Sequence, residues 1–153
     1  MQELLIVWTD INDTGIAIID QQHRGIVSII NSLFFSIRHE QGNRILASSI
    51  DMIGQYTKIH FATEEKILRM SNYPAFDSHK KLHDNLISRS LTTGNESRRY
   101  HDPLIYLDFL KKWWIEHING QDRLYVEHLR NYMAAAHEIH APAGFLHGRE
   151  DLK

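Results

Sequence analysis

Apolar residues recur every three or four positions along most of this chain, which is the spacing of one face of an α-helix. The first stripe predicts a helix that begins near Asp20, a candidate N-cap, and stops at Gly42. The second stripe predicts a helix from about Asn43 to Met70. At about 1.5 Å per residue this second helix would be about 40 Å long, a length that suits an elongated bundle.

Two more helices are predicted in the second half of the chain. The first would begin at Asp77 or Ser78 and end near Thr92, where a polar stretch has the composition of a loop. The second would open at Pro103, because proline is favoured in a first helical turn. Its apolar stripe continues to about Met133 with nearly heptad spacing.

The two ends of the chain lack this periodicity. Residues 3–18 mix short apolar runs with turn-forming residues, and we expect an arm that lies across the bundle with Trp8 as its anchor. From Ala134 the pattern dissolves, which predicts a frayed helix end and then a mobile tail. The expected fold is therefore all-α: an up-down-up-down four-helix bundle with an N-terminal arm (residues 1–133) and a short C-terminal tail (residues 134–153).

Composition removes several classes of function. The formal net charge is -2 and no run of Lys or Arg exceeds two residues, so no nucleic-acid partner is expected. The absence of cysteine excludes iron–sulfur clusters, thiol nucleophiles and cysteine-ligated zinc, so any metal must be held by nitrogen and oxygen. No apolar run is long enough to span a membrane, and Met1–Asp10 lacks signal-peptide features, so we expect a cytoplasmic protein with no membrane partner.

Histidine is unusually frequent, with 11 among 153 residues, and several histidines lie on the predicted buried stripes. The i to i+4 spacings of His60 with Glu64 and of His79 with His83 place each pair on one helix face. Burying such groups without partners would be costly, and a shared metal centre would remove that cost. The ligand-type residues predicted to face inward are His23, His60, Glu64, His79, His83, His117 and Asp122.

The number of donors in this set suits a pair of metal ions. Five imidazoles supply five nitrogens and two bridging carboxylates supply four oxygens, whereas two octahedral ions have twelve positions. A solvent-derived oxo or hydroxo bridge would occupy two of the remaining three positions. One position would then stay open for a single small ligand.

Four motifs carry these residues, and in this order and spacing they are highly specific. They are I-D-Q-Q-H ending at His23, H-F-A-T-E-E beginning at His60, H-K-K-L-H from His79 to His83, and W-W-I-E-H-I-N-G-Q-D from Trp113 to Asp122. From Trp8 to about Tyr132 the chain resembles the hemerythrin family, in its bacterial single-domain form.

The resemblance implies two iron ions held by unequal sets of histidines. The sets are His79, His83 and His117 for one ion, and His23 and His60 for the other. Glu64 and Asp122 would bridge the two ions together with the oxo or hydroxo group. O2, with NO as a second candidate, would bind reversibly at the open position of the ion with two histidines, for oxygen storage, delivery or buffering.

By the same resemblance, four apolar residues would wall the ligand pocket: Ile26, Phe61, Trp113 and Ile118. Trp114 departs from the family pattern, which more often has an aliphatic residue there. Tyr125 lies one turn after Asp122 and could support the site from outside, whereas Glu65 should point away from the bridge. Among the other histidines, His39 and His101 are predicted at the surface and His128 in the core or at its boundary.

Two further functions remain open beside reversible O2 binding. The chain could be a sensor of O2, NO or redox state that acts through a protein partner, or a di-iron enzyme such as an oxidase, peroxidase or NO reductase. We expect no enzyme, because the sequence offers no substrate pocket beyond the small-ligand site. A helical bundle without a metal is the remaining alternative.

Overall fold

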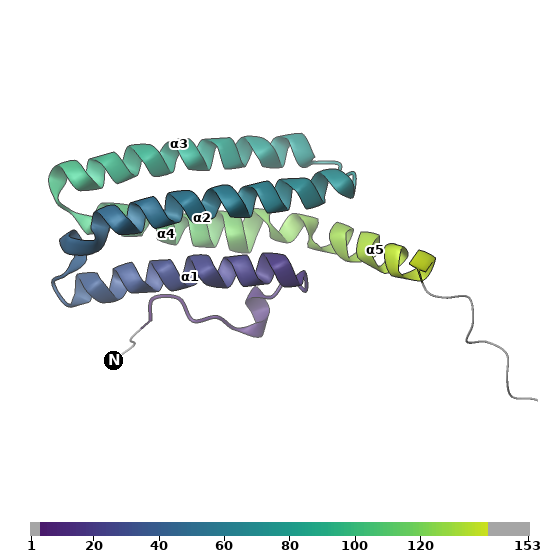
Figure 1. Ribbon diagram of the computed structural model, residues 1–153, viewed down its shortest axis with the longest axis horizontal. Coiled ribbons are helices and arrows are strands. Elements are labelled where there is room, and N and C mark those ends of the chain that lie inside the picture. The colour runs from purple at the N-terminus through teal and green to yellow at the C-terminus, as the bar shows by residue number, and fades with distance from the viewer. Residues whose placement is uncertain (1–3, 141–153) are drawn as a thin grey trace, which may run out of the picture.

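The computed structural model describes residues 4–140, with side chains described as far as Ala136. After a short 3-10 turn (Asp10–Asn12), its elements are α1 (Ala17–Arg38), α2 (Gly42–Met70), α3 (Phe76–Tyr100), α4 (Pro103–Trp113), the π-helical segment η2 (Trp114–Gln121) and α5 (Arg123–His140). Among these helices, α1 and α3 each pack against both α2 and α4, and α2 and α4 also contact each other across the bundle. Figure 1 shows the resulting bundle, which confirms the all-α prediction.

The fourth helix is less regular than the sequence pattern predicts. Asp102 caps it, because its carboxylate accepts the N–H of Leu104 at 2.9 Å, and Pro103 fills the first turn as expected. The prediction of one continuous helix is wrong at Trp114, where η2 begins. Beyond η2, α5 continues the same line past the ends of the other helices (Figure 1).

Tertiary contacts also correct three predicted helix ends. Asp20 is not an N-cap: α1 already begins at Ala17, and Asp20 lies in its first turn. Gly42 does not stop the first helix but opens α2. The polar stretch after Thr92 is not a loop, because α3 continues to Tyr100.

A close helix approach explains why the polar end of α3 remains helical. Gly94 is buried, and a Cβ there would lie only 3.1 Å from the side chain of Ile50 in α2. Ser97 is also buried and donates to the Asp102 carbonyl at 2.6 Å. Small residues at these positions allow α2 and α3 to pack closely, and this packing outweighs the loop-like local composition.

The structure describes only the first part of the predicted frayed helix end and tail. Residues 134–140 belong to α5, so the helix extends seven residues beyond Met133. The rest of the predicted tail, residues 141–153, lies outside the described residues, as do residues 1–3 of the predicted arm. The division at residue 133 stays a prediction.

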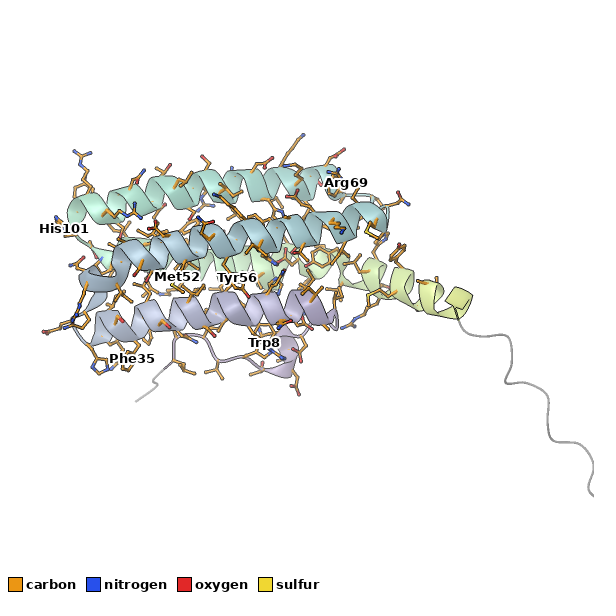
Figure 2. All side chains as sticks on the ribbon, in the orientation of Figure 1. Trp8, Phe35, Met52, Tyr56, Arg69 and His101 are labelled. Atoms are coloured by element: carbon orange, nitrogen blue, oxygen red, sulfur yellow. The ribbon has the colours of Figure 1, made fainter. Side chains whose placement is uncertain are left out.

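The arm is held against α1 and η2 as expected. Asn31 in α1 accepts the backbone N–H groups of Leu5 and Ile6 and donates to the Ile6 carbonyl at 2.8 Å. The Trp8 ring lies 6.0 Å from the Trp114 ring, and Figure 2 shows Trp8 between the arm and α1. The described helices include none long and apolar enough to cross a membrane.

The apolar core is divided into two clusters. The larger contains Ile26, Phe61 and Ile118, and the smaller contains Ile19, Leu68 and Tyr125. On α1, α2 and the fourth helix, the predicted ligand residues occupy positions between a member of one cluster and a member of the other. The polar residues thus form a buried layer across the bundle, with apolar packing on both sides.

Candidate metal centre

All seven predicted ligand residues lie in this buried layer, and none is more than 4% exposed. Their ligand atoms form two groups, within each of which the atoms lie within 4.8 Å of one another. The groups are Glu64, His79, His83, His117 and Asp122, and His23, His60, Glu64 and Asp122. Because Glu64 and Asp122 belong to both groups, the structure brings together three histidines on one side of two carboxylates and two on the other.

Each carboxylate directs one oxygen to each group. Glu64 Oε1 lies 2.5 Å from His79 Nε2 and 3.3 Å from His83 Nε2, while Glu64 Oε2 lies 3.3 Å from His60 Nε2. Asp122 Oδ1 lies 3.1 Å from His117 Nε2, and its Oδ2 lies 3.3 Å from His23 Nε2. This is the arrangement that two carboxylates need in order to bridge a pair of cations.

The π-helical segment explains how His117 and Asp122 reach the same site. They are five positions apart, and in an α-helix their side chains would point about 140° apart. The backbone N–H of Asp122 instead bonds to the His117 carbonyl at 2.9 Å, the i to i+5 bond of a π-helix. The wider turn brings both side chains to one face. The spacing of five positions between two ligand-type residues is the local feature that could have indicated this turn.

The unpaired polar atoms at the centre fit a bound cation. The Nε2 atoms of His23, His60, His83 and His117 and both oxygens of Asp122 are buried without a hydrogen-bond partner among the described residues. Buried polar groups are almost always paired, so such a set requires an explanation. Imidazole nitrogens and carboxylate oxygens are ligands for first-row transition metals, and no cysteine competes with them.

Burial keeps several of these histidines neutral. Loss of hydration, together with the neighbouring imidazoles, lowers the pKa of His23 and of His117 from 6.5 to about 3 and that of His60 to about 4. The attraction of Glu64 acts in the opposite direction on each of them but is weaker. A neutral imidazole has a free lone pair, so these rings are in the form that a metal ion requires.

The two carboxylates respond differently to burial. Burial favours the protonated form of Glu64, but the hydrogen bond with His79 and the close approach of the His83 and His60 rings outweigh it and hold the pKa of Glu64 well below its usual value. Burial and the nearby charge of Glu64 raise the pKa of Asp122 well above its usual value. Two like charges so close together are unfavourable, and a cation between them would relieve the repulsion.

Comparisons with known proteins agree with this site. The model of the hemerythrin HHE cation binding domain matches residues 14–129, which include all seven residues. This chain belongs to the hemerythrin family. As the family description states, this is a cation-binding domain.

Three relatives show the extent of the match. The bacteriohemerythrin of Stenotrophomonas maltophilia is 31% identical over 143 residues, covering 93% of this chain and 93% of that protein. A bacteriohemerythrin of Pseudomonas aeruginosa is 31% identical over 142 residues, covering 92% of each. The crystal structure of a hemerythrin mutant superposes with a TM-score of 0.66 at 25% identity, covering 82% of this chain and 98% of that one.

Hydrogen bonds outside the hemerythrin centre orient two of its histidines. His60 Nδ1 lies 3.1 Å from Gln22 Oε1, and the Gln22 amide donates to Thr63 Oγ1 at 3.1 Å. His83 Nδ1 lies 2.9 Å from Glu65 Oε1. Gln22 Oε1 and Glu65 Oε1 are hydrogen-bond acceptors, so the Nδ1 atoms of His60 and His83 carry the proton and donate it. The lone pair on Nε2 of each ring then faces the centre.

These orienting residues were only partly predictable. Glu65 points away from the bridging carboxylates, as expected, but it contacts His83 and is not merely solvated. Gln22 was missed, although its position beside His23 in the I-D-Q-Q-H motif placed it near the site. The Tyr125 hydroxyl donates to Glu64 Oε2 at 3.1 Å, the supporting contact that the sequence suggested.

The four expected pocket residues lie in the larger core cluster, and each is no more than 3% exposed: Ile26, Phe61, Trp113 and Ile118. Phe61 stacks on the His83 ring with 3.7 Å between centroids and meets the Trp113 ring edge-on at 6.1 Å. His39 and His101 are exposed, and His128 lies 3.0 Å from the Ser71 carbonyl at the boundary of the core, so all three lie outside the centre as predicted.

Proposed function

We propose that this protein binds two iron ions in its buried layer and takes up O2 reversibly at one of them. Three histidines would hold one ion and two the other, as predicted from the family motifs: His79, His83 and His117, and His23 and His60. Glu64 and Asp122 would bridge the ions together with a solvent-derived oxo or hydroxo group. When bound, the reduced iron pair supplies the two electrons that O2 accepts.

The observation that supports this proposal is the orientation of the two shared carboxylates. Glu64 offers Oε1 to one histidine group and Oε2 to the other, and Asp122 does the same with its two oxygens. A single-ion site would not need two carboxylates that each divide their oxygens in this way. The arrangement therefore favours two ions over one.

The unequal numbers of histidines indicate where a small ligand would bind. With shared bridges, the ion held by His23 and His60 has one protein ligand fewer than the ion held by the other three histidines. If both ions prefer six ligands, the additional position for an outside molecule belongs to the ion on the side of His23 and His60.

The surrounding residues would keep that position dry. Ile26 and Phe61 belong to α1 and α2, which carry His23 and His60, and both residues are almost fully buried. An apolar surrounding excludes water and anions, which favours binding and release of a neutral gas over its irreversible reduction. The five histidines and only two carboxylates also supply less negative charge than carboxylate-rich di-iron sites, which again favours reversible binding.

The direct test combines iron analysis with an optical titration. We expect close to two iron atoms per chain, and an absorption band that appears when the anaerobically reduced protein meets O2 and disappears under vacuum over repeated cycles. One iron per chain, or irreversible oxidation within seconds, would refute the proposal. Sustained turnover of NO or peroxide under the same conditions would assign a catalytic function instead.

Storage and sensing require a different experiment, because both begin with the same binding step. A sensor needs a protein that binds only one ligation state of the domain. Affinity capture with the reduced and with the oxygenated protein as bait would distinguish storage from sensing. A storage protein should capture the same set of proteins in both states, whereas a sensor should capture its partner in only one state.

A further inference from the structure

A second cavity lies outside the metal centre, between α2 and α3. Its volume is about 350 Å³, and residues Phe109 and Trp113 of α4 line it as well. Pockets for small molecules have volumes of about 300–1,000 Å³. None of the seven predicted metal ligands lines the cavity, so it is separate from the metal centre.

Its central part is apolar and is lined in one place by a glycine, which has no side chain to fill the space. Ile50, Leu86, Ile87 and Leu91 contribute aliphatic surface, and Gly54 of α2 faces open space, since a Cβ there would have no atom within 4 Å. Glycine in the middle of a helix costs about 0.5–1 kcal/mol relative to alanine. Here the glycine preserves a space that a larger residue would fill.

Three residues that line the cavity have a buried polar atom without a hydrogen-bond partner among the described residues: Thr57, Trp113 and, at the other end, Arg98, whose Nε is unpaired although its guanidinium contacts Asp51. Thr57 and Trp113 are 7% and 3% exposed, and neither the Thr57 hydroxyl nor the Trp113 indole N–H has a hydrogen-bond partner among the described residues. An unpaired buried donor costs about 1–3 kcal/mol. The Thr57 hydroxyl and the Trp113 N–H can both donate, so a bound oxygen acceptor at their end of the cavity would satisfy them.

The charges along the cavity indicate the nature of that acceptor. Lys58, next to Thr57, has no ion pair among the described residues, whereas Arg98 at the other end is paired with Asp51 at 2.9 Å. The positive charge without an ion pair therefore lies at the end with two of the three unpaired donors, Thr57 and Trp113. Asp51 and Lys58 are seven residues apart on α2, about 10 Å, roughly the length of an eight-carbon chain.

We propose that this cavity binds a medium-chain monocarboxylate. Its carboxylate would lie towards Thr57, Lys58 and Trp113, and its alkyl chain would run past Gly54 towards the ion pair of Asp51 and Arg98. This proposal does not depend on the number of metal ions, because no residue that carries it is a predicted metal ligand, although Trp113 also belongs to the expected wall of the small-ligand pocket.

Occupancy of the cavity should affect the metal centre through aromatic contacts. Trp113 lines the cavity and also meets the Phe61 ring at 6.1 Å, and Phe61 stacks on His83 at 3.7 Å. A bound acid would thus be separated from a metal-ligating histidine by two aromatic rings. The domain could therefore couple the presence of a fatty acid to the properties of its metal centre.

The test is calorimetric titration of the full-length, metal-loaded protein with decanoate. We expect one saturable site per chain. Gly54→Leu should fill the cavity and weaken binding at least about tenfold, while Gly54→Ala, which gives the same helix a smaller side chain, should bind within about threefold of the unsubstituted protein. Thermal unfolding of both variants verifies that they fold, which is expected because the position faces open space.

The head group is tested separately with decanol and with Lys58→Met. Decanol should bind at least about tenfold more weakly than decanoate, and Lys58→Met should weaken decanoate binding several-fold without changing decanol binding. No saturable binding of decanoate, or undiminished binding by folded Gly54→Leu, would overturn the site. Equal binding of decanol and decanoate would overturn the assignment of a carboxylate ligand.

Discussion

The contact between Glu65 and His83 allows a sharp test of how the metal centre is held. His83 is fully buried, and its Nδ1 donates to Glu65 Oε1 at 2.9 Å. In Glu65→Ala the N–H of this buried imidazole would lose its charged acceptor, and the Glu65 side chain is only 20% exposed, so water would replace the carboxylate incompletely. The alternative tautomer would remove the cost, but it would put a proton on the nitrogen that faces the metal.

Either outcome should weaken metal binding by a similar amount. An unpaired buried donor costs about 1–3 kcal/mol, and 1.4 kcal/mol corresponds to about a tenfold change in affinity. Outer hydrogen-bond partners of metal-bound histidines typically contribute about 10- to 100-fold. We therefore expect Glu65→Ala to bind Fe(II) about 10- to 100-fold more weakly at the side of the centre that contains His83.

The measurement is anaerobic competition for Fe(II) between the metal-free protein and a coloured chelator. Glu65→Gln retains a side-chain oxygen that can accept the Nδ1 proton, and it should bind within about threefold of the unsubstituted protein. Glu96→Ala removes an exposed carboxylate from α3 and controls for the change in net charge. The reasoning is refuted if Glu65→Ala binds Fe(II) as tightly as the Glu96→Ala control.

Three further outcomes are expected. Gly25→Ala should destabilise the protein by about 1–3 kcal/mol in urea unfolding, because the new Cβ would overlap the Tyr56 hydroxyl. Gly54→Ala is the control and should be neutral or stabilising, because its Cβ meets no other atom. Equal effects of the two substitutions would contradict the close contact of Gly25 with Tyr56. His117→Ala should lose at least one iron by elemental analysis, while the exposed His39→Ala should keep both, and full retention by His117→Ala would contradict the ligand assignment. The metal-free protein should lose stability as the pH falls from 7.5 to 5.5, because His23, His60 and His117 have a pKa of about 3 or 4 in the folded protein and 6.5 in the unfolded chain, which therefore binds more protons. The expected loss is about 1.4 kcal/mol for each histidine, and the raised pKa of Asp122 offsets part of it. Urea unfolding at both pH values measures the loss, and equal stability at the two values would contradict the prediction.

Local sequence signals were sufficient for the ligand-type residues and for most of the helices. The i to i+4 pairs depend only on helical geometry, so His60 with Glu64 and His79 with His83 could be placed on common faces without a tertiary structure. Pro103 marks a helix start for an equally local reason, since its missing N–H has no partner to lose there. Such features follow from the chain itself.

Helix ends were less predictable because distant residues decide them. The stretch after Thr92 has the composition of a loop, yet it stays helical because Gly94 and Ser97 are buried in the contact of α3 with its neighbours. Local composition reports the preference of the isolated segment. It does not report the free energy that the segment gains when its small residues allow a close helix contact.

The geometry of the centre likewise needed the tertiary structure. The sequence alone determined which side chains could hold a cation, because donor chemistry and helical spacing are local properties. Only the folded bundle decided that Glu64 and Asp122 divide their oxygens between two groups, that a π-helical turn aligns His117 with Asp122, and that Gln22 and Glu65 fix the tautomers of the rings they contact. These relations join residues on different helices or depend on the exact backbone path, and periodicity along one chain carries no information about either.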